Sequence, residues 1–245
     1  MSPSEKNKFI SNWIKSYVDQ MPVKAQSLVI GISGGIDSSV SSTLSAMTGI
    51  KTIVLTMPIR QKNNQHDLSL KHQGWLIKNF KNVEAHTINL DKLFETFSST
   101  LEKFDNEHGY ANSRARLRMT TLYQVAAANK GIVVGTGNKV EDFGVGFYTK
   151  YGDGGVDISP IADCNKTEVW KMGKELGILK KIIEAAPTDG LWDDGRTDEG
   201  QLGLQYHELE EAMNNPNSLN RDKYETIRKQ NLHKMEPIPV CKIPN

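Results

Sequence analysis

The stretch Ser27-Leu28-Val29-Ile30-Gly31-Ile32-Ser33-Gly34-Gly35-Ile36-Asp37-Ser38-Ser39 decides the fold of this chain. Its first part, from Leu28 to Ile32, is a short apolar run rich in β-branched residues, which predicts a buried strand. The glycines that follow adopt positive φ angles at little cost, and Asp37-Ser38-Ser39 has the residue types that begin helices. A strand, a glycine turn and a helix start bring backbone N–H groups and the positive end of a helix dipole to one point. We therefore expect a phosphate or pyrophosphate to bind there.

The residues after the glycines exclude the two commonest phosphate loops. A Walker loop needs Lys and then Ser or Thr, and Ile36 and Asp37 stand in those places. The dinucleotide fingerprint G-x-G-x-x-G is also missing. The remaining pattern, S-G-G-x-D-S after a strand, resembles the loop of the ATP pyrophosphatase superfamily, whose members cleave ATP between the α and β phosphates. A carboxylate at Asp37 beside phosphates indicates a bridging Mg²⁺, with a plain helix cap as the alternative.

Length and composition narrow the class of protein. A chain of 245 residues with 24% charged residues suits one sizeable α/β domain, which we place at residues 1–245. The net charge of +1 gives no support for a nucleic-acid or membrane partner, and no apolar run is long enough to span a membrane. Cys164 and Cys241 are far apart and form neither a metal motif nor a disulfide framework. We therefore expect a cytoplasmic protein with reduced thiols.

Apolar periodicity predicts alternating strands and helices. The expected strands are residues 28–32, 52–56, 82–88 and 131–135, and the expected helices between them are residues 67–80, 91–104 and 112–130. This alternation predicts an α/β fold: a doubly wound, mostly parallel, Rossmann-like sheet with helices on both faces. The polar loop 59–65 follows the second strand, so Arg60 and Gln65 are either nucleotide contacts or solvated loop residues.

The second half of the chain is less regular. Residues 146–157 mix aromatics, one Lys, two Asp and four Gly, a composition that predicts an ordered loop at a site. A helix is expected from Lys166 to Leu176, and two more near residues 206–213 and 222–231. The acidic run 192–199, which lies between the helix at 166–176 and the helix near 206–213, is predicted to be solvated or mobile. In the helix from residue 112, Arg114 and Arg118 share a face and Arg116 points roughly the other way.

Six motifs together resemble one family. They are S-G-G-I-D-S, A-R-L-R-M, G-T-G-N-K-x-E, F-Y-T-K-Y-G-D-G-G-V-D-I, P-T-D-G-L-W and a late His-Lys. Their order over nearly the whole chain is similar to that of ammonia-dependent NAD synthetases, which have an adenine nucleotide alpha-hydrolase-like fold. The most specific element is T-K-Y-G-D-G-G.

The resemblance implies a set of site residues. ATP would contact Gly31, Ile32, Ser33, Gly34, Gly35, Ile36, Asp37, Ser38, Thr136, Lys166 and Thr188. Mg²⁺ would be held by Asp37 and Glu141, although Glu141 as a helix cap is the alternative. Deamido-NAD would contact Arg116, Lys150, Asp157, His233 and Lys234. The resemblance also implies a homodimer with substrate sites near the subunit interface.

The chemistry implied by the resemblance suits these residue types. A carboxylate is a poor electrophile, so ATP converts the nicotinate carboxylate of deamido-NAD to a mixed anhydride with AMP and releases pyrophosphate. Lys166 and the loop N–H groups can stabilise the charge that builds on the α-phosphoryl group. Ammonia then attacks the acyl carbon. Ammonia is mostly ammonium at neutral pH, and we expect Asp153 or Asp157 to take its proton.

Several alternatives remain at this point. Nicotinate mononucleotide could be the acceptor in place of the dinucleotide. A GMP synthetase subunit, a tRNA-modifying enzyme or a nonenzymatic nucleotide-binding protein could carry the same loop. Neither cysteine has a glutaminase motif and the synthetase pattern fills the chain, so free ammonia is the expected donor and no glutaminase domain is expected.

Overall fold

The fold is built around a parallel sheet of four strands. The computed structural model describes residues 1–60, 63–188, 190–192 and 196–244. The strands are β1 (Ser27–Gly31), β2 (Lys51–Thr56), β3 (Val83–Thr87) and β4 (Gly131–Val133), in the spatial order β3-β2-β1-β4. In register, Ser27 of β1 pairs with Lys51 on one side and with Gly131 on the other. The predicted α/β class and the four strands are therefore confirmed.

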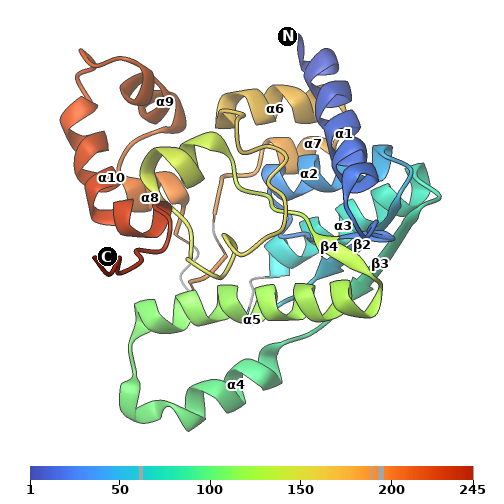
Figure 1. The fold of residues 1–245 in the computed structure, drawn as a ribbon, viewed down its shortest axis with the longest axis horizontal. Helices are drawn as coiled ribbons and strands as arrows, with labels where there is room; N and C mark the ends of the chain where they lie inside the picture. Colours follow the sequence, from blue (N-terminus) through green and yellow to red (C-terminus); the bar gives the residue numbers. More distant parts are fainter. Residues whose placement is uncertain (61–62, 189, 193–195, 245) are drawn as a thin grey trace.

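Helices surround this sheet (Figure 1). The first group along the chain is α1 (Pro3–Gln20), α2 (Ile36–Met47), α3 (Asn63–Asn79), α4 (Asp91–Thr100) and α5 (Glu107–Ala128). A short 3₁₀ helix, η1 (Glu102–Phe104), and a π-helix, η2 (Lys139–Val145), interrupt the series. The second group is α6 (Lys166–Glu175), α7 (Lys180–Ile183), α8 (Asp198–Leu202), α9 (Tyr206–Asn214) and α10 (Arg221–Met235).

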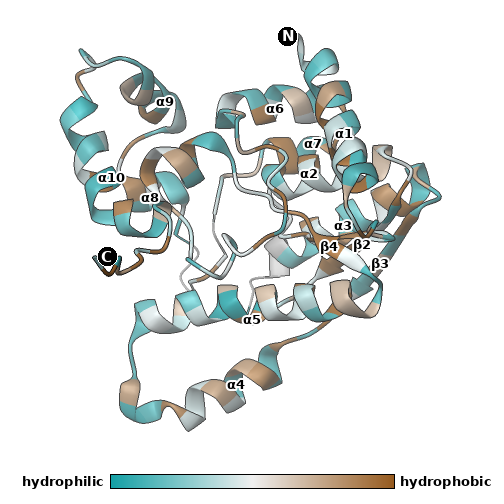
Figure 2. Cartoon of the chain, viewed as in Figure 1, coloured by the Kyte–Doolittle hydropathy of each residue, from teal (hydrophilic) through white to brown (hydrophobic). Residues whose placement is uncertain are grey.

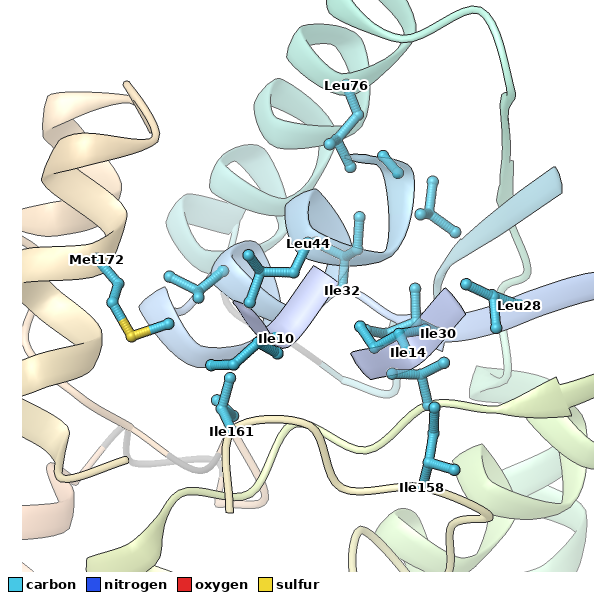
Figure 3. Packing of buried hydrophobic residues seen from close by; sticks show 14 of the residues in the cluster. Ile10, Ile14, Leu28, Ile30, Ile32, Leu44, Leu76, Ile158, Ile161 and Met172 are labelled. Carbon is cyan, nitrogen blue, oxygen red and sulfur yellow. The ribbon is translucent and has the colours of Figure 1, made fainter. Parts of the chain in front are cut away.

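Alternate residues of β1 face opposite layers, as a strand requires. Leu28 and Ile30 join a core with residues of α1, α2, α3 and α6 (Figure 3). Val29 joins a second core with residues of α4, α5 and β2. Both faces of β1 are thus covered, which explains its unbroken apolar run. In Figure 2 the hydrophobic colours accordingly gather on the strands.

A third core joins the C-terminal helices to η2. We call α8, α9 and α10 the C-terminal helical module. Its buried residues pack against two residues of η2, Val140 and Val145. Gly146 ends η2 with a φ of +67°, a left-handed conformation that suits glycine. The π-helix therefore packs against this module.

Three predicted boundaries differ from the structure. Helix α3 begins at Asn63, so part of the expected loop 59–65 is helical. Helix α5 begins at Glu107 and not at the expected residue 112, because Asn106 caps the helix by accepting a hydrogen bond from the Gly109 N–H at 2.7 Å. The helix expected over 91–104 is divided into α4 and η1. None of the helices in the described part of the chain combines the length and the apolar character that a membrane span requires.

Candidate active site

The loop between β1 and α2 is held by its own serines. The Ser33 N–H donates to Ser38 Oγ at 3.2 Å, and the Gly35 N–H donates to Ser33 Oγ at 3.2 Å. Gly34 has a φ of +93°, the left-handed region that the glycine pair was expected to supply. The helix cap is Gly35 rather than Asp37, which lies one residue inside α2. The carboxylate of Asp37 is therefore available for another role.

A cavity of about 580 Å³ opens at this loop, at the carboxyl ends of β1 and β4. Every residue expected to contact ATP lines it: residues 31–38, Thr136, Lys166 and Thr188. Glu141 and Asp153 line it as well. Segments from four parts of the chain thus meet where a doubly wound sheet places its ligands.

Lys166 lies between the two carboxylates expected to hold the metal. Its Nζ donates to Glu141 Oε1 at 2.9 Å and also to Asp37 Oδ2. The Lys166 side chain is 3% exposed, so both ion pairs are sheltered from water. Burial acts to lower the pKa of Lys166, but the charges of Asp37 and Glu141 outweigh it and raise that pKa above its ordinary value. Lys166 is therefore a permanent ammonium at neutral pH.

The two carboxylates titrate differently. Burial raises the pKa of Asp37 above its usual range, against the pull of Lys166. Burial also tends to raise the pKa of Glu141, but the Lys166 charge and the hydrogen bond from Tyr206 hold that pKa below its usual range. Glu141 consequently stays ionised to a lower pH than Asp37 does.

Asn138 connects these carboxylates and was missed by sequence reasoning. Its Nδ2 donates to Asp37 Oδ1 at 3.3 Å, and its Oδ1 accepts from the N–H groups of Val140 and Glu141, both at 3.1 Å. It is fully buried. The available signal was its place in G-T-G-N-K-V-E, where Asn is a good cap for the helix that carries Glu141.

Two further acidic residues face the cavity. Burial, together with the charges of Glu141, Asp153 and Asp37, raises the pKa of Asp142 to about 8. Burial raises the pKa of Asp153 to about 6, and the hydrogen bond from the Thr149 backbone acts against that rise. Asp153 accepts a hydrogen bond from the Thr149 N–H at 2.9 Å, which fixes it within the glycine-rich loop.

The carboxylate pair fits Mg²⁺. Mg²⁺ prefers oxygen ligands and is usually bound through one or two carboxylates together with substrate phosphates and water. Asp37 and Glu141 converge on a single cation, the Lys166 ammonium, beside the phosphate loop. The described residues contain no group of three His, Cys, Asp or Glu side chains that could hold a metal. This arrangement suits a metal that is shared with a nucleotide.

The residues expected to bind deamido-NAD lie outside the walls of this cavity. Arg116 Nε donates to the Lys150 carbonyl at 3.3 Å, and Lys150 Nζ donates to the His233 carbonyl at 3.4 Å. Lys234 Nζ donates to the Tyr148 carbonyl at 2.7 Å. These contacts bring α5, the glycine-rich loop and the end of α10 together at the surface.

Asp157 is placed differently from these residues. Its two oxygens accept hydrogen bonds from the Tyr123 hydroxyl at 3.1 Å and from the Val133 N–H at 2.7 Å. It therefore ties the glycine-rich loop to β4 and α5. Asp153 lines the cavity and Asp157 does not.

The three arginines of α5 divide as expected, because Arg116 is exposed while the other two turn inward. Arg118 lines the cavity and its Nε donates to the Met57 carbonyl at 3.0 Å. Arg114 is buried and donates to the Leu191 carbonyl at 2.8 Å. Arg60 is exposed and its backbone N–H bonds to Asp91 at 2.6 Å, away from the cavity. The side chain of Gln65 lies outside the described residues.

The acidic run 192–199 does not lie wholly in solvent, as had been expected. Asp198 is 5% exposed, lines the cavity and begins α8. It is also within 3.2 Å of the Tyr206 hydroxyl. Residues 193–195 of the run lie outside the described residues. The expectation was wrong for Asp198 because a tertiary contact, which no local pattern reports, buries it.

The parallel sheet and its cavity define an α/β protein with a candidate ligand site at the strand–loop–helix turn between β1 and α2. Comparison with known proteins narrows the class. The family model named NAD synthase matches residues 7–243, and the chain belongs to this family.

Individual relatives agree with that assignment. An NH(3)-dependent NAD(+) synthetase of Carboxydothermus hydrogenoformans is 37% identical over 214 residues, which are 85% of this chain and 84% of that protein. The solved structure of an NMN synthetase from Francisella tularensis is similar with a TM-score of 0.88 and 32% identity, covering 100% of this chain and 99% of that one. An NH3-dependent NAD synthetase from Campylobacter jejuni has the same fold, with a TM-score of 0.79, 23% identity and coverage of 99% and 100%.

Proposed function

We propose that this protein is a C–N bond-forming ligase that converts deamido-NAD to NAD with ATP and ammonia, through an adenylated intermediate, and releases AMP and pyrophosphate. Membership of the NAD synthase family supports this reaction over the GMP synthetase, tRNA-modifying and nonenzymatic alternatives. The observation that carries the proposal is the cavity in which the phosphate loop, Lys166 and the Asp37–Glu141 pair meet.

The residues of the cavity have separate tasks in this reaction. The loop N–H groups and the start of α2 bind phosphate oxygens. Lys166 is a fixed cation that stabilises the charge on the α-phosphoryl group as pyrophosphate leaves. Asp37 and Glu141 would hold Mg²⁺, which when bound supplies positive charge to the phosphates. Adenylation needs no protein nucleophile, because the acceptor's own carboxylate attacks.

We assign the ammonium site to Asp153 rather than to Asp157. Asp153 faces the cavity, whereas both oxygens of Asp157 bond to the scaffold. Asp153→Asn should therefore lower turnover at limiting ammonium by about 10²-fold or more, while pyrophosphate release in the adenylation step persists. Asp157→Asn is the matched variant, and it should lower thermal stability more than it changes the ammonium dependence. Normal turnover of Asp153→Asn at limiting ammonium would exclude this role.

We also propose free ammonia as the nitrogen donor. A glutaminase needs a reactive thiolate. Cys164 is 4% exposed, and burial raises the pKa of its thiol to about 11, so it stays protonated at neutral pH. Purified protein should use ammonium and not glutamine, and turnover with glutamine alone would contradict this part of the proposal.

The second candidate is amidation of nicotinate mononucleotide to NMN by the same chemistry. It is supported by the full-length similarity to the Francisella NMN synthetase. One assay separates the two functions: purified protein with ATP, Mg²⁺ and ammonium is given each deamidated acceptor in turn, and AMP and the amide product are measured. We expect the higher kcat/KM for the dinucleotide. A higher value for the mononucleotide selects the second candidate, and turnover of neither acceptor rejects both.

We also propose that the protein forms a homodimer, as its resemblance to the family implies. Helix α4 lies at the edge of the molecule beside α5 (Figure 1). Phe94 is the buried residue of α4, while Leu93 is 50% exposed and the nearby Phe104 is 78% exposed. We propose that this apolar edge is the subunit interface, which sedimentation at several protein concentrations can test. The cytoplasmic location stays a prediction from the cysteine usage.

A further inference from the structure

The hydroxyl of Tyr206 is directed at the cavity from the C-terminal helical module. Tyr206 is the first residue of α9 and is 1% exposed. Its ring packs in the module's core with Val140 and Leu209, and its hydroxyl donates to Glu141 Oε1 at 2.5 Å. A phenylalanine would fill this apolar core without burying a polar group, and a buried hydroxyl is costly unless it is bonded. The hydroxyl therefore serves Glu141 rather than the core.

The single phenol proton has two carboxylates within reach. Glu141 Oε1 lies at 2.5 Å and Asp198 Oδ2 at 3.2 Å from the hydroxyl oxygen. A phenol donates one hydrogen bond, and the shorter distance assigns it to Glu141. Oε1 of Glu141 also accepts from Lys166, so both strong bonds go to the same oxygen. Neither of these two bonds uses the other oxygen, Oε2.

The aromatic ring acts on Lys166 as well. Lys166 Nζ lies 4.8 Å from the centroid of the Tyr206 ring and 6.0 Å from that of Trp170. The two rings meet edge to face, with centroids 5.8 Å apart. Cations are attracted to aromatic faces at such distances. Tyr206 thus contacts both the anion and the cation at the centre of the cluster.

We propose that Tyr206 is a positioning residue for the metal: its hydroxyl fixes the carboxylate of Glu141, so that docking of the C-terminal helical module prepares the Mg²⁺ site. This inference rests on the proposed function, in which Asp37 and Glu141 hold the metal. Groups that orient a metal ligand typically change metal affinity by about 10–100-fold when they are removed. We expect a loss in this range for Tyr206→Phe.

The test measures metal binding apart from catalysis. Mn²⁺ binding is followed by electron paramagnetic resonance with ATP present and without an acceptor. Tyr206→Phe should weaken Mn²⁺ binding by about 10-fold or more. In the amidation assay the same variant should need more Mg²⁺ for half-maximal rate, and saturating metal should restore most of kcat. Tyr206→Leu also lacks the hydroxyl and should show the same loss if Tyr206→Phe folds poorly.

Tyr224 provides the matched control. It lies in the same core, is 3% exposed, and places its hydroxyl 3.3 Å from the Gly144 carbonyl instead of at the cavity. Tyr224→Phe should keep wild-type Mn²⁺ affinity. Unchanged affinity in Tyr206→Phe, or equal losses in the two phenylalanine variants, would overturn the inference. Failure of the wild type to turn over either acceptor would instead refute the proposed function, because the binding measurement needs no acceptor.

Discussion

Replacement of Lys166 by Met tests the charge balance of the site. In the folded protein the Lys166 ammonium is 3% exposed and pairs with two carboxylates that are each 16% exposed. Removing one partner of a buried ion pair typically costs about 3–5 kcal/mol, because the remaining charge is left uncompensated. Here two like charges remain beside each other, so we expect Lys166→Met to lie at the upper end of that range in the absence of metal.

This cost can be measured as a change in melting temperature. For a protein of this size each 1 kcal/mol shifts the melting temperature by about 2–4 °C, so a cost of about 5 kcal/mol should lower it by about 10–20 °C in EDTA. A divalent cation can take the place of the ammonium between Asp37 and Glu141. Binding at 100 times the Kd returns about 2.7 kcal/mol. Saturating Mg²⁺ should therefore raise the melting temperature of Lys166→Met more than that of the wild type.

A surface pair supplies the control for this experiment. Lys24 Nζ lies 2.5 Å from Asp19 Oδ1, with 62% and 44% of the two side chains exposed. Pairs open to solvent contribute about 0–1 kcal/mol, so Lys24→Met should shift the melting temperature little and show no Mg²⁺ dependence. A wild-type melting temperature for Lys166→Met in EDTA, or equal stabilisation of Lys166→Met and the wild type by Mg²⁺, would contradict this prediction.

Two further predictions concern stability. His72 is fully buried, and burial lowers its pKa from the ordinary 6.5 to about 4. As the pH falls, the histidine of the unfolded chain therefore takes up a proton before that of the folded protein does. The free energy of unfolding should decrease by about 3 kcal/mol between about pH 6.5 and pH 4. Urea denaturation across this range should show a flatter pH profile for His72→Gln, and parallel profiles would contradict the assignment. A Cβ on Gly137 would lie 1.9 Å from Asp142 Oδ2, so Gly137→Ala should cost about 1–3 kcal/mol by thermal denaturation. Adding Asp142→Ala should recover part of that loss, and a double variant no more stable than Gly137→Ala would exclude this clash as the cause.

Local patterns were sufficient for the sheet and the phosphate loop. Strands β1 and β2 contain continuous apolar runs rich in β-branched residues, because both of their faces are buried. The edge strand β3 is more polar and more exposed, so its pattern is weaker. The structure places β1 within one residue of the expected bounds. The loop could be identified because S-G-G-x-D-S specifies backbone geometry within a few residues. The start of α5 was also predictable in principle from the cap at Asn106.

The contacts that organise the cavity could not be predicted in the same way. Tyr206 and Glu141 are 65 residues apart, and Lys166 and Asp37 are 129 residues apart. Their meeting depends on how the C-terminal helical module and α6 pack, which periodicity does not specify. The π-helix that carries Glu141 has no simple sequence pattern either, although such helices often occur at functional sites.

The charges of the cavity predict that a cation and the nucleotide bind together. Glu141 and Asp153 face the cavity beside Asp37, and the buried ammonium of Lys166 is already engaged by Asp37 and Glu141. Carboxylates in a sheltered cavity raise the local concentration of cations and repel a free triphosphate. We therefore expect the site to discriminate against metal-free ATP and to favour its Mg²⁺ complex. The same potential attracts ammonium, so one set of carboxylates can serve the metal in the first half of the reaction and the nitrogen donor in the second.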